Sequence, residues 1–78
     1  LPPMPKALAE KVLSDREIEV LSLVAQGMIN KEIADQLNIG LTTVISHRKN
    51  IQEKLGMKSV SALTIYAVMH GYVDINHI

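Results

Sequence analysis

The sequence predicts an all-α domain of four short helices, and three observations support this fold class. Aliphatic residues recur at helical spacing in four separate segments. Helix-start signals at Ser14 and Ser59, and stop signals at Gly27, Gly56 and Gly71, bound these segments. Hydrophobic residues make up 47% of the chain but aromatic residues only 3%, so the core must be aliphatic, and we find no strand pattern.

The first helix is expected to begin after Ser14. Residues 14–17, Ser-Asp-Arg-Glu, have the pattern of a capping box, in which the Ser14 hydroxyl accepts from the Glu17 amide and the Glu17 carboxylate reaches back. Leu13 lies where a hydrophobic staple would face Ile18. The expected buried stripe consists of Ile18, Leu21, Val24 and Ala25, and Gly27 supplies a left-handed end.

The second helix is expected from about Asn30 to Leu37, with Asn30 as its cap. Its buried edge should contain Ile33, Ala34 and Leu37. A tight turn at residues 38–40 follows, with Ile39 turned inward.

The third helix is expected from about Leu41 to Leu55, with Gly56 at its end. One face of this helix should be buried, and it carries Val44, His47, Ile51 and Leu55. Because His47 lies on this buried face, we expect a core histidine that is hydrogen-bonded to the backbone. The alternative, a metal ligand, would need nearby ligands, and His70 and His77 are too isolated in the sequence to provide them.

The fourth helix is expected over about 59–70 and is apolar nearly all round. The face that should pack on the core carries Leu63, Tyr66, Ala67 and His70. In a small domain, an apolar surface outside the core is usually covered by a partner. We therefore expect a dimer contact through Ile65, Val68 and Met69; the alternative is a few scattered exposed apolar side chains.

The second and third helices are joined by a short turn that contains Gly40, which is the spacing of a helix-turn-helix. The second helix of such a pair lies in the major groove of DNA. The expected base contacts are Ile45, which can touch a thymine methyl, Ser46 and Lys49. The expected phosphate contacts are Lys31, Thr42, Thr43, Arg48, Asn50 and Lys54.

The charge distribution supports this interpretation, although the net charge is zero. Residues 41–58 carry four basic residues and only one acidic residue, whereas the acids concentrate earlier in the chain. A charged face on a single helix usually does no more than solvate it. The turn, the helix pairing and the local charge together favour DNA binding.

Residues 13–59 resemble the LuxR-type (GerE/FixJ/NarL-like) family of DNA-binding domains. The resemblance rests on the opening at 13–17, on 30–34 (Asn-Lys-Glu-Ile-Ala), on Thr43-Val44, on His47 and Asn50-Ile51, and on 54–56 (Lys-Leu-Gly). It extends over about 13–73 and implies a four-helix helix-turn-helix bundle, related to winged-helix domains but without the wing. It further implies the effector domain of a response regulator or ligand-gated activator, with two copies on DNA, often paired through the fourth helix.

This resemblance divides the chain into an interdomain linker at 1–12, the DNA-binding domain at 13–73 with its helix-turn-helix at about 30–49, and a tail at 74–78. Three positions depart from the family pattern. Ile45 and Val60 stand where the family usually has basic residues, which weakens the phosphate contribution to affinity. Gly40 replaces the usual Ser or Thr cap at a cost of a few tenths of a kcal/mol.

We therefore expect a module of a bacterial transcription regulator that binds specific DNA as a dimer, under the control of a missing N-terminal receiver or sensor domain. The alternative is a helix-turn-helix module for protein interaction with weakened DNA binding. The expected partners are double-stranded DNA and a second copy, with RNA polymerase a further candidate. We expect no enzyme activity, metal, cofactor, small-molecule ligand or membrane span, and a cytoplasmic location; the chain has no cysteine.

Overall fold

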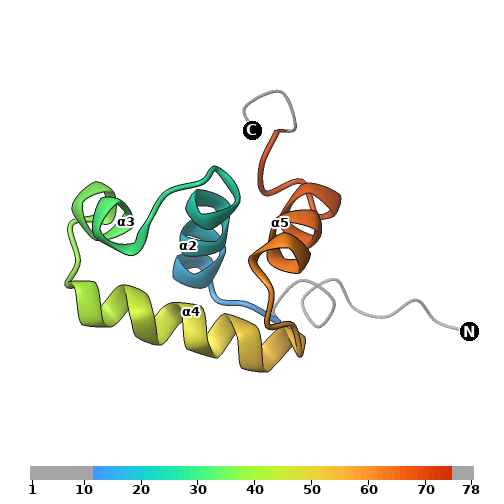
Figure 1. The fold of residues 1–78 in the computed structure, drawn as a ribbon, viewed down its shortest axis with the longest axis horizontal. Helices are drawn as coiled ribbons and strands as arrows, with labels where there is room; N and C mark the ends of the chain where they lie inside the picture. Colours follow the sequence, from blue (N-terminus) through green and yellow to red (C-terminus); the bar gives the residue numbers. More distant parts are fainter. Residues whose placement is uncertain (1–11, 75–78) are drawn as a thin grey trace, which may run out of the picture.

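The computed structural model describes residues 12–74, and within them the chain forms four helices and no strand (Figure 1). The helices are α2 (Asp15–Ala25), α3 (Asn30–Leu37), α4 (Leu41–Leu55) and α5 (Val60–Met69). This confirms the predicted all-α fold. The expected linker and C-terminal tail lie outside the described residues, apart from Val12 and Asp74.

Helix α2 begins with the predicted capping box. The Glu17 amide donates to the Ser14 hydroxyl at 3.2 Å, and the Ser14 amide donates to Oε1 of Glu17 at 2.9 Å. Two of the amides that an α-helix leaves unpaired at its start are thereby satisfied. Leu13, just before the cap, is buried in the core, and Ile18 packs against that core. Gly27, which follows the end of α2, has a φ of +91°.

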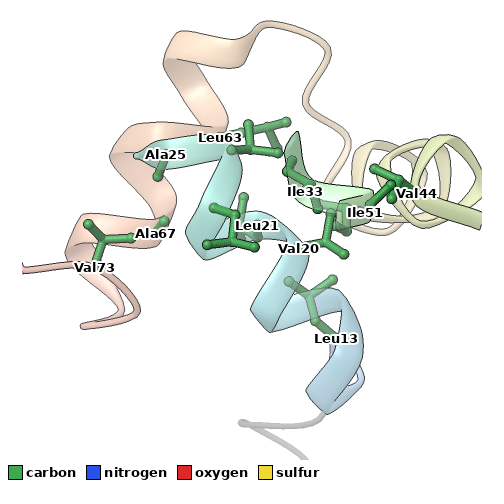
Figure 2. Close-up of a cluster of buried hydrophobic side chains, with 13 residues drawn as sticks. Leu13, Val20, Leu21, Ala25, Ile33, Val44, Ile51, Leu63, Ala67 and Val73 are labelled. Atoms are coloured by element: carbon green, nitrogen blue, oxygen red, sulfur yellow. The ribbon is translucent and has the colours of Figure 1, made fainter. Parts of the chain in front are cut away.

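Helix α2 is the central element of the domain and contacts α3, α4 and α5. Figure 2 shows Leu21 in the middle of the core, between Ile33 and Ile51 on one side and Ala67 on the other. The sequence predicted one buried stripe on α2, but Val20 and Leu23 are also buried. Because three helices pack around α2, it is apolar over more of its circumference than a surface helix.

The turn between α2 and α3 differs from the prediction at its cap. Ile29, and not Asn30, is the N-cap of α3, and its amide donates to Oε1 of Glu32 at 2.9 Å. Only one half of a capping box is therefore formed, because the isoleucine side chain has no atom that can accept from the amides of α3. Asn30 is therefore the first helical residue, and its side chain is available for a contact with α4.

Helix α5 follows a predicted start at Ser59, whose hydroxyl accepts from the Ala62 amide at 3.0 Å. Leu63 and Ala67 are buried against α2, as expected. The expectation that His70 packs into the core is wrong, since its side chain is exposed at the end of α5. The ring of His70 instead stacks on Tyr66, with centroids 4.0 Å apart. Burial of Tyr66, with a smaller effect of Tyr72, raises the pKa of the Tyr66 phenol.

Among the described residues, no helix combines the length and apolar character that a membrane span requires.

Candidate nucleic-acid interface

Helix α4 is held by one side only. Its buried residues are Val44 and Ile51, and it contacts α2 and α3. Leu55 packs against the same core. In Figure 1, α2, α3 and α5 all lie above α4, and the lower side of α4 is uncovered in this view. The predicted hydrophobic face of the helix is thus confirmed for Val44 and Ile51.

His47 does not take the place expected for it. Its side chain is half-buried, and within residues 12–74 its ring makes no hydrogen bond. Its position lies about 60° around the helix from Val44 and 40° from Ile51 at about 100° per residue. This places His47 at the margin of the buried face, where a ring can remain in contact with water.

The uncovered side of α4 carries the four residues Thr42, Ile45, Ser46 and Lys49, all of which are exposed. On a helix these positions fall within about 100° of one another, on the side opposite Val44 and Ile51. The structure therefore leaves all three predicted base-contacting side chains free of the core. Thr42 lies in the first turn, where the amides of α4 have no partner within the helix.

The turn before α4 sets the angle between α3 and α4. It consists of three residues, and Asn38 adopts the left-handed conformation with φ 56° and ψ 47°. The Ile39 amide donates to the Ala34 carbonyl at 3.0 Å, which closes the end of α3. Gly40 caps α4 with an ordinary φ of −71°. The residue whose conformation makes the turn tight is therefore Asn38.

A side-chain hydrogen bond links the two helices of the pair. Nη1 of Arg48 on α4 donates to Oδ1 of Asn30 on α3 at 2.7 Å. The guanidinium has five N–H groups, so others remain for an outside acceptor. Arg48 and Asn30 line a hollow in which Ile29 and Val60 also take part.

The predicted phosphate contacts fall into two groups. Lys31, Thr42, Thr43 and Asn50 are exposed, and Arg48 is half-buried with the contact just described. Lys54 differs, because its Nζ lies 2.7 Å from Oε1 of Glu17, whose side chain is only 5% exposed. The structure thus gives Lys54 a partner inside the domain.

These contacts stabilise the charged form of Glu17. Burial by itself raises the pKa of the Glu17 carboxyl, but hydrogen bonds from Lys54 and Ser14 and the charge of Lys54 outweigh it, so the pKa lies below its ordinary value. The carboxylate of Glu17 accepts both from the cap of α2 and from α4. One side chain therefore fixes the start of α2 and the position of the C-terminal half of α4.

One further basic residue, Lys58, lies close to the exposed face of α4. From the sequence, it was counted only in the charge of residues 41–58. Lys58 is exposed in the connection after α4, and its carbonyl accepts from Nε2 of Gln52 at 3.4 Å. Lys58 lines a second hollow together with Lys49, Gln52, Glu53 and Gly56. Its position beside Lys49 follows from the end of α4 at Gly56, and the linear spacing gave no reason to single it out.

No group of histidine and acidic side chains suited to a metal ion is found among residues 12–74.

Two helices joined by a three-residue turn, the second of which exposes a polar and basic face, define a helix-turn-helix domain of the DNA-binding class. Residues 11–67 match the family described as bacterial regulatory proteins, luxR family. The chain belongs to this family, and the resemblance inferred from the sequence is confirmed.

The chain is also similar to oxygen regulatory protein NreC of Staphylococcus aureus. It is 48% identical over 58 residues to the proteins of strains JH9, Mu3 and NCTC 8325. The match covers 74% of this chain but 27% of each relative. The chain therefore spans about a quarter of the length of these relatives.

Proposed function

We propose that this domain reads DNA sequence by inserting α4 into the major groove, with Ile45, Ser46 and Lys49 at base edges. The observation that carries the proposal is the exposure of these three side chains on the side of α4 that faces away from the core. An α-helix fits the major groove, and its exposed face is the part that meets the bases. Membership of a family of bacterial regulatory proteins supports the same function.

Phosphate contacts hold the helix in register. Lys31 in the first turn of α3, Thr42 and Thr43 in the first turn of α4, and Asn50 farther along α4 are exposed and polar. Arg48 offers its remaining N–H groups beside Asn30. We leave Lys54 out of this set, because its ammonium group is 2.7 Å from a buried carboxylate. Removing it from Glu17 would leave a charge uncompensated.

Two copies bind together through α5. Ile65 and Met69 are 59% and 79% exposed, Val68 is half-buried, and α5 contains no charged residue. A face of this kind is suited to a second copy of itself, because a two-fold axis brings the same residues of both copies into contact. Two-fold pairing would also match DNA half-sites related by symmetry.

In the longer regulator, we propose that a receiver or sensor domain controls whether two copies pair, and that the regulator acts on chromosomal DNA in the cytoplasm with RNA polymerase as a further partner. The matched relatives are regulatory proteins in which this segment is about a quarter of the length. Two-component control would place a receiver domain in the remaining part.

A protein-interaction module with weakened DNA binding is the second candidate. Ile45 and Val60 are about half exposed, at 49% and 50%, and neither can neutralise a phosphate. The zero net charge of the chain also favours this candidate.

Binding measured over a salt series separates the two candidates. The logarithm of affinity should fall linearly with the logarithm of salt concentration, by about 0.9 for each phosphate that is neutralised. Replacement of Lys49 by alanine should in addition relax the preference for one base. Affinity for duplexes that is weak at low salt and indifferent to their sequence would favour the interaction module.

A further inference from the structure

Ile45 is an aliphatic side chain in the middle of the proposed interface. It is 49% exposed, and Thr42, Ser46 and Lys49 around it are all polar and exposed. Ile45 is not among the residues that form or pack against the hydrophobic core. The hydrophobic core therefore does not account for an aliphatic residue at this position, and an apolar group on whatever α4 meets would give its exposed half a partner.

The major groove offers few groups that suit such a side chain. Base edges there present hydrogen-bond donors and acceptors, and the one large apolar group is the C5 methyl of thymine. Opposite another base, Ile45 would cover a donor or acceptor that it cannot satisfy, which is unfavourable. Opposite thymine, the same side chain buries a methyl group against its own carbons.

Lys49 lies one turn farther along the same face. Four residues of helix correspond to about 6 Å, and successive nucleotides of one strand are about 3.4 Å apart. Lys49 thus reaches about two base pairs beyond Ile45, if α4 follows the groove. Its ammonium group suits O6 and N7 of guanine.

We propose that Ile45 makes the domain select thymine through its methyl group, in a half-site in which a guanine lies about two base pairs away and is bound by Lys49. This inference rests on the proposed function, because it assigns particular bases to the same helix. Ile45 then acts as a specificity-determining residue that reads shape and apolar surface.

The test begins with selection of preferred sites from random duplexes, followed by replacement of the selected thymine by deoxyuridine, which removes only the methyl group. The unaltered domain should bind the deoxyuridine duplex about fourfold more weakly, the factor expected for one buried methyl. The Ile45→Ala variant should bind the two duplexes with affinities that differ by less than about twofold, because alanine keeps only a small contact with the methyl group. Ile45 is exposed and outside the core, so the variant should fold.

Val60→Ala is the matched control, because Val60 is 50% exposed but lies on α5. This variant should retain the full effect of deoxyuridine. A selected site without a thymine two base pairs from a guanine, or equal binding of thymine and deoxyuridine duplexes, would overturn the inference but leave sequence-specific binding intact. Failure to select any site would overturn both the inference and the proposed function.

Discussion

Lys54 and Glu17 lie 37 residues apart in the chain and are joined by a 2.7 Å contact between Nζ and Oε1. Glu17 is also the third residue of α2, and its side chain completes the capping box that begins at Ser14. The helix proposed to read DNA is therefore anchored, at its C-terminal half, to the first turn of the central helix.

Replacement of Lys54 by glutamine should destabilise the domain by about 1–2 kcal/mol. The loss leaves a buried carboxylate without its cation, and the cost is reduced because Lys54 itself is 44% exposed. Urea unfolding followed by circular dichroism measures the change in the free energy of unfolding. Lys58→Gln is the control, since the exposed Lys58 should change stability by less than about 0.5 kcal/mol. Equal stability of the two variants would contradict a structural role for Lys54.

Stability should fall in acid because of Glu17. Its pKa is lowered in the folded domain, so the stabilisation is fully present above the unfolded value of about 4.3 and is lost as the pH falls through the lower folded value. In Glu17→Gln, glutamine can still accept from the Ser14 amide but carries no charge. The unfolding free energy of this variant should therefore vary less with pH than that of the unaltered domain. The comparison is made between about pH 5 and pH 3, where the Glu17 carboxyl is expected to titrate. The same acid dependence in both proteins would assign the effect to other carboxyl groups.

The salt dependence of DNA binding should distinguish two lysines of the predicted phosphate set. Lys31→Gln should reduce the slope of log affinity against log salt by about 0.9, because one phosphate contact is lost. Lys54→Gln should leave that slope unchanged, because its ammonium group is paired with Glu17. Fluorescence anisotropy with a labelled duplex measures both. A reduced salt slope in the Lys54 variant would indicate that Lys54 does contact a phosphate.

Pairing on DNA should depend on α5. Met69→Glu places a charge on a side chain that is 79% exposed and should weaken the binding of a second copy about tenfold, the value for loss of one buried side chain of this size. Sedimentation with a duplex that contains two half-sites measures the number of copies bound. Gln36→Glu, at an exposed position of α3, is the control for the added charge. Undiminished pairing of the Met69 variant would exclude α5 as the contact.

Local sequence signals predicted the helices and their ends well. The capping box at Ser14, the turn before Leu41 and the end of α4 at Gly56 depend on neighbouring residues, so the sequence states them directly. The exposed positions of Ile45 and Lys49 also followed from helical periodicity, since Val44 and Ile51 fix the opposite face. For these features, the spacing of residues and the structure agree.

Contacts between distant residues were less accessible to sequence reasoning. The ion pair of Lys54 with Glu17 and the hydrogen bond of Arg48 with Asn30 depend on how helices cross, which periodicity within one helix does not contain. The burial of Val20 was missed for a similar reason, because a helix surrounded by three others has no single apolar stripe. Two basic side chains that the sequence assigned to phosphate contacts, Arg48 and Lys54, therefore also have partners within the domain.

The division of α4 into a held side and an open side has a consequence for protein engineering. Because the anchoring residues Val44, Ile51 and Lys54 differ from the exposed residues proposed to contact bases, those exposed residues can be replaced without changing the interior of the domain. A library varied at Thr42, Ile45, Ser46 and Lys49 would then sample new DNA targets on one unchanged framework. The domain would then serve as a fixed framework on which the proposed base contacts can be exchanged.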